Sequence, residues 1–191
     1  AGRAAYERIG FTVTPRGHHL EWGTGNWCIM FERDYLELRG VIDPAIAHNV
    51  GHALGDHEGL MGIAFGTDDA EASCDALLRR GLHPRPVRRL TRDFELPEGT
   101  VQPKFSLCFL DTADTPGLMS VVLCQHLTPE LLRRPAWLRH ANGARAVRSV
   151  RSVVPDLAAA ADRHVKLFGP QAIVRQKDRI EIRVNTRQTI Y

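Results

Sequence analysis

Residue types suited to catalysis or metal binding gather in the stretch GHHLEWGTGNWCIMFERDYLELRG, from Gly17 to Gly40. It holds the adjacent histidines His18 and His19 and, further on, Glu37 in the apolar run YLEL. A carboxylate that points inward from a strand is costly to bury unless it is paired or bound to a metal, so Glu37 is a candidate metal ligand or pocket residue. The alternative is that the strand directs Glu37 outward into solvent, as is usual for glutamate.

The two histidines must point to opposite faces of a strand, because side chains alternate along it. An imidazole on the inner face could bind a substrate or transfer a proton near neutral pH, which makes His19 a catalytic candidate. The alternative is a half-exposed histidine that is hydrogen-bonded to the following turn. That turn is GTGN, which matches a hairpin connection and would use Asn26 to fix the backbone.

The histidines elsewhere are weaker candidates. His126 follows Gln125 at the end of the strand-like segment VVLCQH, where either side chain could reach a binding site. His140 and Asn142 lie in HANGA, whose Asn-Gly pair is a strong signal for a tight turn, so their simplest role is structural. Three more lie in the glycine-rich segment HNVGHALGDHEG, which we interpret as a linker with at most adventitious metal binding: His48, His52 and His57.

Composition narrows the class of protein. The 191 residues are 43% hydrophobic, enough for a folded core, and 25 basic residues against 22 acidic ones leave a net charge of +3. The arginines are scattered among acidic residues, so we expect no nucleic-acid partner. The four cysteines are widely spaced and predict reduced core thiols. No apolar run is long enough to span a membrane, so we expect a cytoplasmic protein without a membrane partner.

Several reaction classes lack their sequence signatures. The chain contains no GxSxG elbow, no P-loop and no dinucleotide fingerprint in the required strand-turn-helix setting. Hydrolase-triad, kinase and Rossmann functions are therefore set aside.

Helix-forming segments recur along the chain, and each ends at a glycine that can adopt a left-handed cap: Gly10, Gly81 and Gly169. Strand-like segments such as FTVTPRG and ARAVRSVRSVV accompany them. The pattern predicts an internally repeated unit of one strand, one helix and about three strands. We place these units at residues 1–58, including a linker, at 59–128, and at 129–191 with a connector and a partial third unit. One such unit leaves a face of its sheet bare, so two units must pair.

A family resemblance accompanies these patterns. The series AAYERIGFTVTPRGHHLEWGTGNWCIMFERDYLEL, followed at a distance by WLRHANGARAV, resembles the glyoxalase-like branch of the vicinal oxygen chelate superfamily. This superfamily includes glyoxalase I, extradiol dioxygenases and bleomycin-resistance proteins. The resemblance implies an α+β fold of repeated βαβββ modules, whose mainly antiparallel, curled sheets pair into a cup. It also implies that the first strand of the first module is missing from this sequence.

The resemblance assigns roles to the candidates. Family metal sites take one ligand from the first strand of a module and a carboxylate from its last strand, where Glu37 stands. His19 matches a family motif that begins at Gly17 and continues into the Gly-Thr-x-Asn turn. His126 is the second metal-ligand candidate, whereas Gly62 occupies the first-strand ligand position of the second module and has no side chain to coordinate. The implied cofactor is a divalent ion, Mn, Fe, Zn or Ni, held by Glu37 and His126.

Two functions follow from the resemblance. The first is a metal-dependent enzyme of lyase, isomerase or dioxygenase type, with His19 and Glu37 catalytic, acting on a small oxygen-bearing substrate. The second is a non-catalytic binding or sequestration protein of bleomycin-resistance type. In either case the ligand is a small molecule, and a homodimer is one option for the assembly. The substrate-binding candidates are Trp22, Asn26, Trp27, Tyr35, His140 and Asn142.

Overall fold

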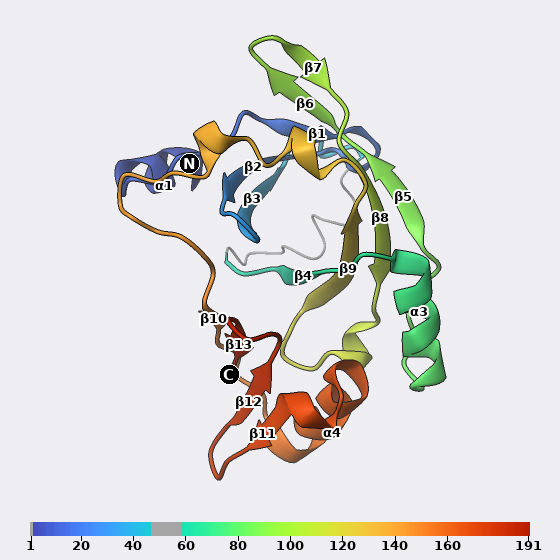
Figure 1. The fold of residues 1–191 in the computed structure, drawn as a ribbon. Coiled ribbons are helices and arrows are strands. Elements are labelled where there is room, and N and C mark those ends of the chain that lie inside the picture. The colour runs from blue at the N-terminus through green and yellow to red at the C-terminus, as the bar shows by residue number, and fades with distance from the viewer. Residues whose placement is uncertain (1, 47–58) are drawn as a thin grey trace. The chain divides into compact units, whose positions relative to one another are not determined.

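The structure is a computed structural model that describes residues 2–46 and 59–191. The linker histidines His48, His52 and His57 lie outside the described residues. Within the described part, α-helices and strands are mixed along the chain, so the predicted α+β class is confirmed (Figure 1). The α-helices are α1 (Gly2–Arg8), α3 (Ala70–Arg79) and α4 (Leu157–Phe168). Short 3-10 helices are η1 (Leu20–Trp22), η2 (Thr112–Asp114), η3 (Pro129–Leu131), η4 (Pro135–Trp137) and η5 (Pro170–Ala172).

The chain divides into two compact units that interleave in sequence. Unit 1 comprises the described parts of residues 1–59, together with 90–105 and 127–147. Unit 2 comprises residues 60–89, 106–126 and 148–191. The predicted module boundaries at 58/59 and 128/129, and the pairing of the first two modules into a cup, stay predictions.

Unit 1 contains a five-stranded sheet in the order β3-β2-β1-β6-β7, with every pair antiparallel. The strands are β1 (Gly17–His19), β2 (Thr24–Met30), β3 (Tyr35–Val41), β6 (Asp93–Leu96) and β7 (Gly99–Val101). The hairpin of β6 and β7 thus joins the sheet of the first module, although it lies within residues 59–128, which were predicted to form the second module.

Two details of the first module differ from the sequence-based expectation. The turn between β1 and β2 is not GTGN but η1 plus Gly23, which has a φ of 58°, whereas Thr24 to Asn26 already belong to β2. The predicted strand in FTVTP does not form a ladder. Pro15 lacks an N–H, and Thr14 is instead held by hydrogen bonds with the Cys28 backbone, from Thr14 N to the Cys28 carbonyl and from Cys28 N to Thr14 Oγ1.

Unit 2 contains two sheets of the same connectivity. The second module has β4 (Gly62–Gly66), β5 (Arg88–Thr91), β8 (Lys104–Phe109) and β9 (Ser120–His126) in the order β4-β9-β8-β5, with β4 parallel to β9. The third has β10 (Ser149–Val150), β11 (Ile173–Arg175), β12 (Ile180–Arg183) and β13 (Thr189–Ile190) in the order β10-β13-β12-β11, with β10 parallel to β13.

Each of these modules is a strand, a helix and three strands, with the first strand beside the last, so the predicted βαβββ repeat is confirmed. The third module, predicted to be partial, has all four strands, but each is only two to four residues long.

The helices begin and end at the capping residues and glycines in their sequences. Asp69 and Asp156 cap α3 and α4 by accepting hydrogen bonds from the backbone N–H groups three residues on, at 2.9 and 3.0 Å. All three glycines predicted to follow the helices have a positive φ, between 73° and 87°. The predicted helix ends near Gly10, Gly81 and Gly169 are therefore confirmed.

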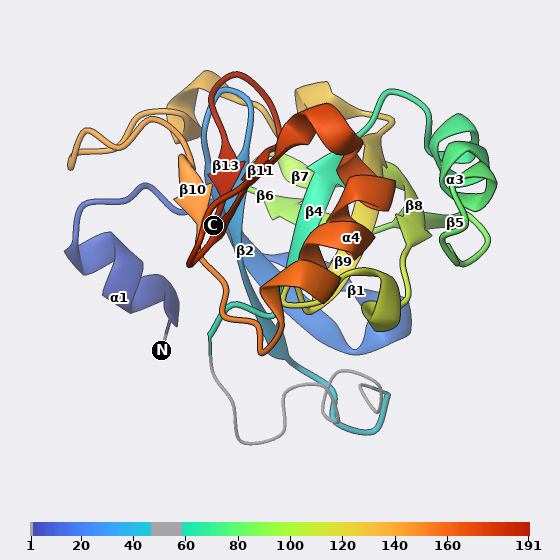
Figure 2. The ribbon, with the colours of Figure 1, turned by 90° about the horizontal axis from the view of Figure 1, so that it is seen from below.

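The core of unit 2 joins its two modules. Helix α4 (Figure 2) packs with strands of both sheets through a shared cluster of buried apolar residues. The Phe65 ring of β4 meets the Phe168 ring of α4 edge to face at 5.3 Å. The four cysteines, all in described segments, are buried and form no disulfide, as predicted. In the described part of the chain we find no helix with the length and apolar character needed to cross a membrane.

Candidate functional site

One face of the sheet in unit 1 gathers most of the predicted site residues. Residues that lie opposite each other on neighbouring strands project to the same face. The register pairs His19 with Thr24, Cys28 with Glu37, and Asn26 with both Gly17 and Arg39, so all of these share one face. We call this group the His19–Glu37 face: Gly17, His19, Thr24, Asn26, Cys28, Glu37 and Arg39.

His19 is buried on this face, with 5% of its surface exposed. Its Nδ1 lies 3.2 Å from Thr24 Oγ1, and its ring stacks on Trp22 with a centroid distance of 5.5 Å. Burial lowers the pKa of His19 from 6.5 to about 4; the Glu37 carboxylate opposes this shift, and Arg39 and Arg92 add to it. His19 is therefore a neutral imidazole at neutral pH, able to accept a proton or a hydrogen bond.

Glu37, the carboxylate in the apolar strand β3, is exposed and hydrogen-bonded on the His19–Glu37 face. It lies on the same face as buried Asn26 and Cys28 but keeps an exposed side chain, so it is neither deeply buried nor turned to the other side. Its Oε1 accepts a hydrogen bond of 2.8 Å from Asn26 Nδ2. Glu37 also lies close enough to His19 to act on its pKa. The structure thus brings His19, Asn26 and Glu37 together.

Two arginines contribute positive charge near this carboxylate. Arg39 stands two residues after Glu37 on β3, donates from Nε to Thr24 Oγ1 at 3.3 Å, and places its guanidinium carbon 5.1 Å from the centre of the Trp22 ring. Arg92, between β5 and β6, is only 5% exposed and acts on the pKa of His19. Arg39 and Arg92 give the face a positive potential beside one carboxylate.

Cys28 completes the face without offering a nucleophile. Burial raises the pKa of its thiol to about 12, with Arg92 opposing the shift and Glu37 adding to it. The thiol stays protonated at neutral pH, whereas the thiolate is the reactive form of cysteine.

The remaining aromatic candidates divide between the two faces. Tyr35 lies opposite Met30 and shares the face of Glu37, whereas Trp27 lies opposite Leu38 and projects to the other face. His18 also projects to the other face, as predicted, and its Nε2 lies 2.8 Å from Glu95 Oε1.

His140 and Asn142 are engaged by the backbone. His140 Nδ1 accepts from Thr12 N at 3.0 Å and its Nε2 lies 3.0 Å from the Met30 carbonyl oxygen, so the ring donates through Nε2. Asn142 donates to the Ile9 carbonyl at 2.9 Å, next to the glycine that ends α1. These contacts tie α1 to the sheet of unit 1, and a role of either residue in substrate binding stays a prediction.

The two metal-ligand candidates belong to different units, so their joint role stays a prediction. His126 closes β9 in unit 2, whereas Glu37 belongs to unit 1. Over residues 2–46 and 59–191, no group of three or more His, Cys, Asp or Glu side chains is arranged to hold a metal ion. A side chain at position 62 would displace the adjacent strand, because a Cβ there would lie 2.5 Å from the Ser120 carbonyl oxygen.

Sequence reasoning missed the two arginines. Arg39 carries a readable signal, because it lies two residues after Glu37 and so shares its face of β3. Arg92 carries none, since only the fold brings a residue between two distant strands to this face. Thr24 and Cys28 were likewise missed as site residues, the first because it was assigned to a turn.

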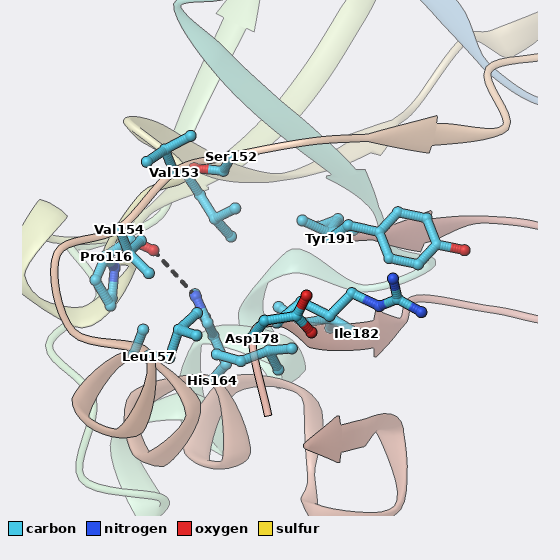
Figure 3. Close-up of a pocket in the computed structure, with 14 residues that line it drawn as sticks. Pro116, Ser152, Val153, Val154, Leu157, His164, Asp178, Ile182 and Tyr191 are labelled. Carbon is cyan, nitrogen blue, oxygen red and sulfur yellow. Dashed lines mark hydrogen bonds between the residues drawn. The ribbon is translucent and has the colours of Figure 1, made fainter. Parts of the chain in front are cut away.

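A separate hollow lies within unit 2, between α4 and strands β12 and β13 (Figure 3). This cavity of about 230 Å³ is mostly lined by apolar side chains such as Leu157, Ile182 and Ile190. His164 lines it, but its Nε2 is bonded to the Pro116 carbonyl at 3.0 Å, and burial lowers the pKa of His164. The imidazole is neutral and helps to hold α4 in place.

Repeated βαβββ modules, with a polar face of histidine, asparagine and glutamate on the first, define an α+β protein of the glyoxalase type. The glyoxalase-like domain family matches residues 1–168, and the chain belongs to that family, consistent with the vicinal oxygen chelate superfamily. Among curated proteins, none matches the chain. A solved structure described as a hypothetical protein from Staphylococcus aureus is similar at 15% sequence identity, with a TM-score of 0.73, covering 94% of this chain and 76% of that one. This likeness supports the fold alone.

Proposed function

We propose that the chain is a glyoxalase-like protein that binds a small oxygen-bearing organic molecule on the His19–Glu37 face. The observation that carries the proposal is the pair of guanidinium groups, Arg39 and Arg92, beside a single carboxylate. Cationic donors of this kind attract carbonyl, hydroxyl or carboxylate oxygens. The same positive potential disfavours a divalent cation.

The groups on this face that could bind a metal ion also favour an organic ligand. His19 and Glu37 are two groups of the kind that bind metals, and divalent sites usually take three or more protein ligands. Glu37 is already bonded to the Asn26 amide, and His19 Nδ1 is close to the Thr24 hydroxyl. The described residues of this face therefore do not form a complete metal site, but they do form a hydrogen-bonding surface for a neutral or anionic ligand.

The experiment is a thermal melt of the protein with a panel of catechols, hydroxy acids, oxo acids and their neutral analogues. A compound that binds only the native state raises the midpoint with its concentration. Glu37→Gln and Arg39→Gln should reduce the shift, while Arg88→Gln, an exposed arginine on β5, serves as the matched control. A panel that never moves the wild-type midpoint would contradict the proposal.

A second candidate function is the metal-dependent enzyme of lyase, isomerase or dioxygenase type. It is favoured by the neutral state of His19 beside the Glu37 carboxylate, because metal ligands must be deprotonated to bind. His126 is the second metal ligand that the sequence proposes beside Glu37, and further ligands would have to come from outside this face. We expect Glu37→Gln to keep the fold but to lower metal content if this candidate is correct.

Metal analysis of protein purified without chelators separates the two candidates. Near-stoichiometric Mn, Fe, Zn or Ni in the wild type, lost in Glu37→Gln, would establish the enzyme candidate. A low metal content in the wild type and in Glu37→Gln, with a melting midpoint that added divalent ions do not change, would contradict the enzyme candidate and support the binding protein.

A further inference from the structure

Arg92 is a buried guanidinium held between two aromatic rings. Its guanidinium carbon, Cζ, lies 5.5 Å from the centre of the Phe94 ring and 5.4 Å from the centre of the Phe105 ring. The residue is 5% exposed. Contacts of this kind hold the planar group and contribute a modest attraction. They do not supply a negative charge.

No acidic side chain of the described residues forms an ion pair with Arg92, and its Nε is buried without a hydrogen-bond partner. Cys28 interacts with it, but burial raises the pKa of this thiol to about 12 and keeps it neutral. Glu37 is bonded to Asn26 instead. A buried charge in this state is strongly unfavourable unless something compensates it.

The chain shows elsewhere how it compensates a buried charge. The Asp114 carboxylate is 1% exposed, and it accepts a 2.6 Å hydrogen bond from the His83 backbone N–H. The Arg163 guanidinium lies 3.5 Å from its other oxygen. Asp114 is thus matched by its own chain, whereas Arg92 is not.

A glycine on β1 allows polar side chains to lie close to the backbone beside Arg92. A Cβ on Gly17 would lie 3.4 Å from Arg92 Nη1 and 2.4 Å from Asn26 Oδ1, an oxygen that is itself buried without a hydrogen-bond partner. Any side chain at position 17 would crowd both polar groups. The absence of a side chain at position 17 therefore allows the Arg92 guanidinium and the Asn26 amide oxygen to approach β1, next to the His19–Glu37 face.

We propose that Arg92 is the anchor for a carboxylate group of the ligand, so that the molecule bound on this face is a small organic acid. This inference rests on the proposed function and names its ligand class. The planar guanidinium can donate two parallel hydrogen bonds to the two oxygens of a carboxylate, which a neutral amide cannot accept in the same way. The incoming carboxylate would supply the charge that Arg92 lacks within its own chain.

The first test compares acids with their amides on the wild-type protein. Titration calorimetry is run with acetate, pyruvate, benzoate and salicylate against acetamide, pyruvamide, benzamide and salicylamide. We expect at least one acid to bind about tenfold or more tightly than its amide, as a charge-assisted pair requires. If no acid is preferred to its amide, the carboxylate anchor is wrong, while binding of the amides would leave the proposed function in place. If neither acids nor amides bind, the carboxylate anchor is wrong, and the proposed function is then decided by the catechols and neutral analogues of the melting panel.

The second test uses two substitutions of Arg92. Arg92→Lys keeps the charge but loses the planar fork, so we expect the preference for the acid to fall about tenfold. Arg92→Met should abolish the preference and leave the ligand-free midpoint unchanged or higher, because it removes an uncompensated buried charge. Arg88→Met is the control and should change neither quantity. A purely structural Arg92 would instead give a large loss of stability in Arg92→Met and an unchanged preference for the acid in Arg92→Lys.

Discussion

His19 shows how burial decides the chemistry of a side chain on this face. An exposed histidine titrates near neutrality, whereas His19 has its pKa lowered to about 4 by burial despite the nearby Glu37 carboxylate. The desolvation of the imidazolium outweighs the attraction to the carboxylate, and Arg39 and Arg92 reinforce the result. The face therefore presents a neutral hydrogen-bonding ring between charged groups.

This pKa predicts how stability depends on pH. The folded value of about 4 lies below the unfolded value of 6.5, so the contribution of His19 is complete above pH 6.5 and is lost as the pH falls toward 4. The full effect is about 3 kcal/mol, from the size of the shift. Urea unfolding of the wild type and of His19→Gln at pH 7.5, 6, 5 and 4.5 should show a shallower loss in the variant. Parallel pH profiles for the two proteins would mean that His19 protonates freely when folded.

At the scale of elements, the parallel pair of β4 and β9 depends on a glycine. Gly62→Ala would place its Cβ 2.5 Å from the Ser120 carbonyl oxygen, and the strands must separate to relieve the clash. We expect a cost of about 2 kcal/mol, typical of inserting a methyl group into a packed site. Gly66→Ala on the same strand is the matched control, because nothing lies within 4 Å of its added Cβ. Equal melting temperatures for the two variants would contradict the close approach.

Helix ends were predictable because their signals are local. Gly10, Gly81 and Gly169 stop helices through their own backbone freedom, and this information lies within a few residues. The turn after β1 was predicted too late because Thr24 to Asn26 resemble a turn locally but are held in β2 by pairing with residues 17–19 of β1 and 39–41 of β3. Tertiary pairing overrode local turn preference at this point.

The candidate site was also only partly predictable from the sequence. His19, Asn26 and Glu37 could be placed on one face by strand alternation, since all three come from consecutive strands. Arg92 could not, because its position depends on the β6–β7 hairpin joining the first sheet from a distant part of the chain.

At the scale of the whole molecule, the two units share strands along the chain. β5 and β8 each begin in one unit and end in the other. The chain also passes between the units several times, and no single cut in sequence separates them. We therefore expect unfolding in one cooperative transition.

The placement of the tryptophans allows a direct test of this coupling. All three, Trp22, Trp27 and Trp137, belong to unit 1, whereas Val121 is fully buried in unit 2. Val121→Ala should lower the urea midpoint seen by tryptophan fluorescence as much as the midpoint seen by far-UV circular dichroism. Ile29→Ala, fully buried in unit 1, is the reference variant for a direct effect. A fluorescence transition that ignores Val121→Ala would show that the units unfold independently.

The close contact at Gly62 also limits which sequences the chain can reach by single substitutions. A residue with a side chain at this position meets the backbone of β9, so a histidine there becomes tolerable only if the neighbouring strand has already moved. Either change alone would disturb the pairing of β4 with β9. A side-chain ligand at this position therefore requires a coordinated change in both strands.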